Sequence, residues 1–287
     1  MEETKIIVLP TKGEKPDLEN GSIFFIGTAT VILRYAGFTI LTDPNFLHQG
    51  EEVHLHYGIK SPRLTNPAIE IEELPPLDLI VLSHMHDDHF DRVAAQKLDK
   101  NIPIVTTHEA TVELKQKGFN STHSLNTWET ITVSKGEVTL GITAMPGRHG
   151  PMLLASLLPP VIGSMLEFQA PSGKTSFRLY ITGDTLITQQ LKEIPQRYSD
   201  IDLALLHLGG TKVFGVLLTM DAKQGVEALQ IIAPKTAIPI HYNDYTVFKS
   251  PLEDFMQAVT AAGLEKQVKY LKHGDTYNFQ VDVADFS

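Results

Sequence analysis

The 287-residue sequence contains no cysteine. Thiolate zinc sites, a cysteine nucleophile and a redox dithiol are therefore excluded, and the core must form without disulfides. Basic residues are also few, with 24 Lys and Arg against 34 Asp and Glu and a net charge of -10. Because nucleic-acid binding normally depends on basic contacts to phosphates, this balance argues against DNA or RNA as the main partner.

Long apolar segments are missing as well. The longest, Met152–Gly163, is interrupted by Pro159 and Pro160 and is too short to span a bilayer. The N-terminal residues MEETKIIVLPTKGEK carry charges throughout, unlike a secretory signal. We therefore expect a cytoplasmic protein with no transmembrane segment, and the sequence leaves its oligomeric state open, a homo-oligomer included.

The remaining composition, 42% apolar and 20% charged, is typical of a globular protein. No repeat or linker interrupts the chain, so we expect one domain over residues 1–287. Short apolar runs that alternate with helical patterns in both halves predict an α/β fold with two sheets covered by helices. A long irregular insertion, about residues 44–75, breaks this rhythm, and loops of that length tend to be functional.

The predicted elements are bounded only to within a few residues. The predicted strands are Ser22–Ile26, Thr30–Tyr35, Phe38–Leu41, Leu77–Leu82, Ile102–Thr107, Glu129–Val133, Val138–Ala144, Ser164–Phe168, Phe177–Ile181, Leu203–Leu208, Ala237–His241 and Val268–Phe279. The predicted helices are Asp91–Lys100, His108–Lys117, Leu186–Gln196, Asp221–Ala233 and Leu252–Ala262.

Histidine is abundant, with 12 in the chain, and its placement indicates a metal site. The apolar strand Leu77–Leu82 runs directly into the segment Ser83–Phe90, whose sequence is SHMHDDHF. Residues 84–89 of this segment fit the pattern HxHxDH. Imidazole and carboxylate are the ligands that zinc accepts when thiolates are absent. His84, His86, Asp88 and His89 are too crowded to serve one tetrahedral ion, which suggests two ions. The competing interpretation, a solvated turn, does not explain three histidines that follow a buried strand.

Three more candidates follow other predicted strands. His149 lies in the turn PGRHG, Asp184 in the turn TGDT, and His241 at the end of the strand that begins at Ala237. Each alone would more often be a turn or capping residue than a ligand. Their common position at the C-terminal ends of strands favours a shared site, because ligands gather at such edges in α/β folds.

Five motifs in this order resemble those of the metallo-β-lactamase-fold hydrolases: Thr42-Asp43-Pro44, the HxHxDH segment, His149, Thr182–Thr185 and His241. The resemblance covers about residues 20–280. Within that superfamily, the LTDP start at Leu41 and the ELPPLD lead-in at Glu73 are similar to the N-acylphosphatidylethanolamine phospholipase D-like and ascorbate-6-phosphate lactonase-like branch. The resemblance implies an αββα four-layer sandwich with a binuclear metal site at one edge of the two sheets.

The same resemblance implies a division of the ligands. His84, His86 and His149 would hold one divalent ion, Asp88, His89 and His241 a second, and Asp184 would bridge them. Zinc is the first expectation, with manganese or iron as alternatives. Asp43 would accept a hydrogen bond from a ligand histidine or a backbone amide. One departure is Gly27-Thr28, where relatives often carry His or Asn.

The expected activity is that of a binuclear metal-dependent hydrolase, with Asp88 and Asp184 as the catalytic residues. Two ions would lower the pKa of a shared water and so provide hydroxide to attack an ester, lactone or phosphodiester of a small-molecule or lipid-like substrate. A nuclease of the same fold is disfavoured by the charge balance. A non-catalytic metal-binding or sensor protein is disfavoured because all seven ligand positions are filled. No general acid can be named, and Asp87 is expected to point away from the metals.

Substrate recognition is assigned to two apolar-rich segments, Phe46–Asn66 and Pro151–Gly163, although core packing explains the second equally well. His48, His54, His56 and Tyr57 in the first segment are either exposed or substrate contacts. His207 either lines the pocket or is a buried, hydrogen-bonded histidine. Asp221 is expected to cap a helix, and His108, His123 and His273 to be surface or capping residues. Gly209-Gly210 is too weak a signal for a phosphate loop.

Overall fold

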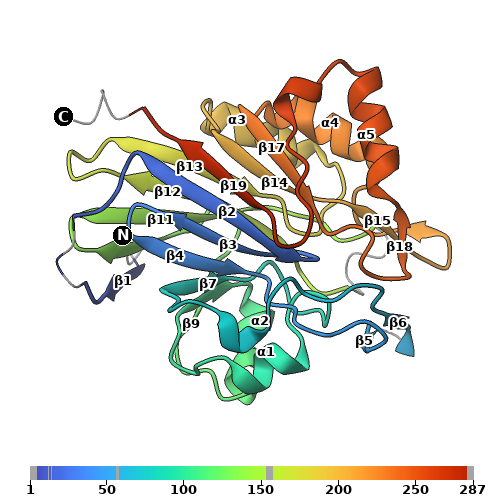
Figure 1. Cartoon of the computed structure of the whole chain (residues 1–287), viewed down its shortest axis with the longest axis horizontal. Coiled ribbons are helices and arrows are strands. Elements are labelled where there is room, and N and C mark those ends of the chain that lie inside the picture. The colour runs from blue at the N-terminus through green and yellow to red at the C-terminus, as the bar shows by residue number, and fades with distance from the viewer. Residues whose placement is uncertain (1–4, 12, 14, 56–57, 153–157, 283–287) are drawn as a thin grey trace.

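The computed structural model describes residues 5–11, 13, 15–55, 58–152 and 158–282. Two seven-stranded sheets pack face to face, and helices cover the outer face of each (Figure 1). This is the αββα sandwich that the sequence predicts. Within the described residues, no helix is both long enough and apolar enough to cross a membrane.

The first large sheet has the strand order β1-β10-β11-β12-β13-β14-β17. Its centre is antiparallel, whereas β13, β14 and β17 run parallel and bring their C-terminal ends to the same edge. The strands are β1 (Lys5–Leu9), β10 (Thr130–Lys135), β11 (Val138–Pro146), β12 (Ile162–Gln169), β13 (Thr175–Ile181), β14 (Leu203–His207) and β17 (Thr236–Ile240).

The second large sheet has the order β19-β2-β3-β4-β7-β8-β9. Here β4, β7, β8 and β9 run parallel, so their C-terminal ends also meet at one edge. The strands are β2 (Asn20–Gly27), β3 (Thr30–Tyr35), β4 (Phe38–Thr42), β7 (Leu79–Val81), β8 (Ile104–Thr106), β9 (Thr122–Ser124) and β19 (Thr276–Gln280).

The helices form the outer layers. In Figure 1, α1 (Arg92–Lys97) and α2 (His108–Gln116) lie beside β7 and β9, and α3 (Ile194–Arg197), α4 (Ala222–Ile232) and α5 (Leu252–Ala261) lie beside β14 and β17. Asp221 caps α4 as predicted, since its carboxylate accepts a hydrogen bond from the Gln224 amide at 3.1 Å. Single-turn 3₁₀ helices span Ile71–Glu73, Gln189–Glu193 and Glu265–Gln267.

Three apolar clusters hold the layers together. The central cluster lies between the sheets and includes Phe25 and Leu33 from one and Leu140 and Leu166 from the other. Of two further clusters, one joins the first large sheet to its helices and the other joins the second large sheet to its helices. Burial of each such large side chain is worth roughly 1.5–3 kcal/mol, so the three clusters give the scaffold the rigidity that a site at its edge needs.

Two predicted elements are wrong in extent. The expected helix Leu186–Gln196 is a 3₁₀ turn from Gln189 followed by the short α3, because the chain remains extended at its cap, Thr188. The expected strand Val268–Phe279 is confined to β19. Val268 makes only an isolated bridge to Ala237, and a turn at Gly274, with a φ of 89°, interrupts the run.

Several short strands were not predicted. β15 (Gly209–Val213), β16 (Val216–Leu217) and β18 (Phe248–Ser250) form a three-stranded sheet, and β5 (Glu52–His54) pairs with β6 (Lys60–Pro62) inside the insertion. In Figure 1 both small sheets lie toward the same end of the sandwich.

Candidate metal centre

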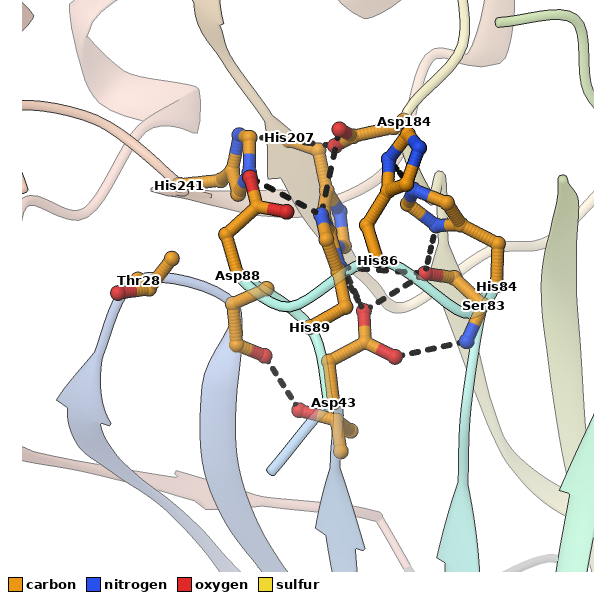
Figure 2. Close-up of polar contacts among 12 residues, drawn as sticks. Thr28, Asp43, Ser83, His84, His86, Asp88, His89, Asp184, His207 and His241 are labelled. Atoms are coloured by element: carbon orange, nitrogen blue, oxygen red, sulfur yellow. Dashed lines mark hydrogen bonds and ion pairs between the residues drawn. The ribbon is translucent and has the colours of Figure 1, made fainter. Parts of the chain in front are cut away.

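The candidate ligands lie at the C-terminal ends of strands from both sheets. Parallel pairing in each sheet carries these ends to one edge of the sandwich. Asp43 follows β4, the HxHxDH loop follows β7, His149 follows β11, Asp184 follows β13, His207 ends β14, and His241 follows β17. These side chains, apart from Met85 and Asp87 of the loop, converge and are buried. Figure 2 shows how those other than His149 lie.

The structure brings His84, His86 and His149 together as one group, with their ligand nitrogens within 4.8 Å of one another. His84 Nε2 and His86 Nδ1 are 2.9 Å apart, and the ring centres of His86 and His149 are 5.1 Å apart. Burial lowers the pKa of His84 and of His149. Both rings are therefore neutral at pH 7, the form in which imidazole binds a metal.

Asp88, His89, Asp184 and His241 form the second group, again with ligand atoms within 4.8 Å. Asp184 lies centrally: its Oδ2 is 3.2 Å from His89 Nε2, and its Oδ1 is 3.5 Å from His241 Nδ1. Asp88 Oδ2 is 3.4 Å from His241 Nε2. The structure thus brings together the residues that the family resemblance assigns to each ion, with Asp184 in the second group, and their binding of metal stays a prediction.

The electrostatics of the second group fit a bound cation. Burial favours the neutral ring of His89, but Asp184, Asp88 and Asp43 outweigh it and hold the pKa of His89 well above its usual value. Burial likewise opposes a charge on His241, yet Asp184 and Asp88 raise its pKa. The carboxylates thus favour positive charge in this buried environment, and divalent ions would supply that charge.

Unpaired polar atoms support the same conclusion. Within the described part of the chain, Asp88 Oδ1 and His149 Nδ1 are buried and have no hydrogen-bond partner. A buried polar atom without a partner costs about 1–3 kcal/mol, so such atoms are rare unless a ligand pairs with them. The mixture of imidazole and carboxylate donors suits zinc, manganese or iron. The residues present therefore fit a metal centre.

Asp43 connects the loop after β7 to the first large sheet. One oxygen, Oδ1, accepts a hydrogen bond from the Ser83 amide at 2.7 Å, and Oδ2 accepts one from His89 Nδ1 at 2.9 Å. His207 Nε2 approaches the same Oδ2 at 3.3 Å, while its Nδ1 lies 3.2 Å from the Thr182 hydroxyl. The predicted role of Asp43 is confirmed, and His207 is a buried, hydrogen-bonded histidine.

The backbone at the site is strained in three places. Thr28, Asp43 and His241 have positive φ values, 52°, 32° and 62°, which non-glycine residues adopt only where the surroundings hold them. The His241 amide donates to the Thr28 carbonyl at 2.6 Å, and the Thr28 amide donates to Asp244 Oδ2 at 2.8 Å. The departure at Gly27-Thr28 therefore leaves a backbone contact to the site in place of a side-chain contact.

A buried polar layer behind Thr28 was not predicted from the sequence. Asp244 also accepts hydrogen bonds from the Thr65 hydroxyl and lies 3.2 Å from His273 Nε2, so His273 is more than a surface residue. Arg63 from the insertion is buried and donates to the Asn45 side chain. Asn45 in turn donates to the carbonyl of Asp87 at 2.9 Å and so holds the HxHxDH loop. Only the long insertion itself signalled these contacts.

The side chains next to the candidate ligands have separate roles. Asp87 points away, as predicted, and accepts a hydrogen bond from the His54 amide at 3.0 Å. Gly183 has a φ of 62°, and a Cβ there would lie 2.6 Å from the Ile162 carbonyl oxygen. A side chain at residue 183 would therefore displace Asp184.

His48 and His54 are exposed, and His56 and Tyr57 lie outside the described residues.

A small pocket opens beside the two groups. Four of the candidate ligands line it, namely His86, Asp88, His149 and Asp184, and the rest of its described lining is Leu55, Ile59, Leu158, Thr211, Val213 and Leu218. Leu55 and Ile59 come from the first predicted recognition segment and Leu158 from the second. Residues 153–157 of that segment, including Leu153 and Leu157, lie outside the described residues. Thr211 and Val213 belong to β15, and Leu218 directly follows β16; this hairpin was not predicted from the sequence.

Comparison with known proteins shows the family of the chain. The family model described as the beta-lactamase superfamily domain matches residues 39–242. A UPF0173 metal-dependent hydrolase from Alkaliphilus metalliredigens is 30% identical over 222 residues, which are 75% of this chain and 87% of the relative.

Two solved structures share the fold. An isothiocyanate hydrolase from Delia radicum gut bacteria has a TM-score of 0.77 at 21% identity, and the match covers 90% of this chain and 99% of that one. Igni18, a metallo hydrolase from Ignicoccus hospitalis, has a TM-score of 0.64 at 24% identity over 91% of this chain and 98% of its own.

Proposed function

This chain belongs to the β-lactamase superfamily and is a metal-dependent hydrolase within it, and from that premise we propose a two-ion enzyme that cleaves an ester, lactone or phosphodiester bond. The observation that carries the proposal is the pair of adjoining His and Asp groups, of three and four residues, that share the wall of one pocket. His84, His86 and His149 would hold one ion and Asp88, His89 and His241 the other, with Asp184 between them.

Divalent ions bound there would polarise a carbonyl or phosphoryl oxygen and lower the pKa of a coordinated water. Asp88 adds a hydrogen-bond acceptor. Burial opposes its charge, but His89 and His241 lower its pKa to about 2, so the carboxylate is ionised at neutral pH. Its Oδ1, which has no partner among the described residues, would accept a hydrogen bond from the attacking water and so orient it.

Asp184 is proposed as the residue that couples the two groups. Its charge raises the pKa values of His89 and His241, and it acts in the same direction on His84 and His149 of the other group. A carboxylate with two oxygens at such a position suits a bridge between two ions. Removal of this charge should therefore weaken both halves of the site together.

The LTDP and ELPPLD segments support a place in the N-acylphosphatidylethanolamine phospholipase D-like and ascorbate-6-phosphate lactonase-like branch. Asp43 of the first segment lies at the site, after β4, whereas Asp78 of the second lies directly before β7, where it accepts the Thr39 amide at 2.8 Å and pairs with Lys135. The branch supports a lactone or phosphodiester substrate. The isothiocyanate hydrolase of the same fold adds a small electrophilic carbon compound as a substrate to test.

The test combines elemental analysis with a substrate panel. Protein purified without added metal should contain about two divalent ions per chain, with zinc expected first. The panel contains a lactone, a neutral ester, a phosphodiester and an isothiocyanate, assayed before and after chelation. Turnover of one of the four that chelation abolishes supports the proposal. A saturated stoichiometry of one ion, or no metal-dependent turnover on any of the four, would contradict it.

A further inference from the structure

Among the described residues that line the pocket beside the two groups of candidate ligands, Thr211 is the only one with a hydroxyl group. It is 5% exposed, and its Oγ1 is buried without a hydrogen-bond partner among the described residues. Its backbone, in contrast, is fully engaged: the amide donates to the Thr219 hydroxyl at 2.9 Å, and the carbonyl accepts from the Leu218 amide at 2.8 Å. Only the hydroxyl is left for a ligand.

The strand that carries Thr211 is fixed to both metal groups. Thr211 pairs with Phe248 of β18, and the ring centre of Phe248 lies 4.4 Å from that of His241. On the other side, the Leu218 carbonyl accepts a hydrogen bond from the amide of Gly150, the residue after His149, at 2.9 Å. The backbone of Thr211 is thus held at a defined place relative to both groups, as an orienting contact requires.

The remaining lining is apolar. Leu55, Ile59, Leu158, Val213 and Leu218 surround the space, and no Lys or Arg occurs in the described part of the lining. A charged group on the substrate would lose its hydration against this wall without an ionic partner from the protein. The pocket is also small, about 40 Å³, so the enclosed part of a substrate must be short.

We propose that Thr211 donates the hydrogen bond that orients a small, uncharged ester or lactone, whose apolar part contacts the five aliphatic side chains of the pocket. This inference rests on the proposed hydrolase function and narrows it to a carbonyl substrate. An unpaired buried hydroxyl is costly, and pairing it with a ligand oxygen recovers part of that cost. The β15–β16 hairpin is then a determinant of specificity alongside the two segments predicted from sequence.

The test uses the metal-loaded protein and δ-valerolactam, a cyclic amide that mimics a lactone but resists hydrolysis. Thr211→Val removes the hydroxyl at constant shape and should weaken binding of the lactam about 3–10-fold by calorimetry, the effect of one neutral hydrogen bond. Thr211→Ser keeps the hydroxyl and should bind within about 2-fold of the wild type. Thr106→Val is the matched control, because Thr106 Oγ1 is also buried without a partner in the described chain but lies in β8, outside the pocket.

Kinetics with p-nitrophenyl acetate, δ-valerolactone and bis(p-nitrophenyl) phosphate then separate the two proposals. We expect the neutral substrates to be preferred and Thr211→Val to raise their KM, with metal content unchanged. Lactam binding as predicted without turnover of any substrate would support the binding site and overturn the reaction. Normal turnover with an unaffected Thr211→Val, failure of the wild type to bind lactam, or preference for the phosphodiester would overturn the inference.

Discussion

Asp43 and His89 are joined by a 2.9 Å hydrogen bond between Oδ2 and Nδ1, buried where β4 and β7 end side by side. The bond leaves His89 Nε2 facing Asp184, the direction in which a metal ligand must point. His89 and His207, which both contact Oδ2 of Asp43, keep its pKa below the usual value although burial raises it, so the carboxylate stays ionised. The pair therefore fixes both the tautomer and the orientation of the ring.

Asp43→Asn should weaken metal binding about 10–100-fold, the usual effect of changing a residue that orients a metal ligand. The amide oxygen can still accept from the Ser83 amide, so the loop should keep its backbone contact. The affinity is measured by competition with a chromogenic chelator. Ser199→Ala, an exposed change in a different part of the chain, serves as the control. Unchanged affinity in Asp43→Asn would show that His89 needs no such support.

Asp184→Ala should lose metal from both groups and nearly all turnover while the fold survives. The physical reason is the loss of the charge that stabilises positive charge around His89 and His241. Elemental analysis and circular dichroism follow metal content and fold. Asp87→Asn is the control, because this neighbouring carboxylate faces the His54 amide and should keep full metal content. An Asp184→Ala enzyme with near-normal turnover would refute the assignment.

The sequence predicts the four layers and the position of the metal groups because both depend on local patterns. Apolar runs such as Leu77–Leu82 form strands wherever they are, and ligands directly after strands must reach one edge once the strands are parallel. The HxHxDH loop lies in such a place. These patterns favour the convergence of His84, His149 and His241, and the resemblance to the metallo-β-lactamase-fold hydrolases supplies their assignment as ligands.

The pocket wall could not be predicted in the same way. β15 and β16 are too short to show a periodicity, and β15 also pairs with β18, about 30 residues later in the chain. Gly209 carries the relevant signal. Its φ is 85°, and a Cβ there would lie 2.5 Å from the His241 carbonyl oxygen, so the glycine allows a close approach rather than phosphate binding. The buried contacts of Arg63 and Asn45 likewise join distant segments.

Acid should destabilise the protein partly through Asp244. Burial raises the pKa of this carboxyl, but His273, Thr65 and Arg63 outweigh burial and lower it below the usual 3.8. A lowered folded-state pKa gives stability that is present above the unfolded value and lost as the pH falls through the folded one. The loss from this group therefore begins below about pH 4.

Asp244→Asn tests the contribution of Asp244 to the free energy of unfolding. The protein is chelated first, so that metal release does not contribute to the measured unfolding. The variant should be about 1–3 kcal/mol less stable at pH 7, because it loses a charged acceptor for Thr28 and Thr65. Below pH 4 its unfolding free energy, measured in urea, should fall less steeply than that of the wild type. Parallel curves for the two proteins would mean that Asp244 has an ordinary pKa in the folded state.

Substrate preference should change when the apolar wall is charged. Leu158, in the segment Pro151–Gly163, lines the pocket, and both its side chain and that of Leu218 lie close to Gly150, the residue after His149. Leu158→Asp should raise KM for hydrophobic esters much more than for small polar ones, since a carboxylate there repels an apolar group and attracts water. Metal content should stay unchanged, because Leu158 belongs to neither ligand group. Leu153→Asp and Leu157→Asp, in the part of the segment outside the described residues, test whether the same wall extends further.

Val112→Asp is the matched control for Leu158→Asp, since Val112 is 46% exposed on α2 and carries the same change from apolar to acidic. It should leave both classes of substrate unaffected. Equal losses on polar and hydrophobic esters in Leu158→Asp, or a fall in its melting temperature large enough to unfold it, would return this segment to core packing. A selective rise in KM would instead place the segment in the binding wall, where an acidic side chain excludes the apolar part of the substrate and leaves the metal groups intact.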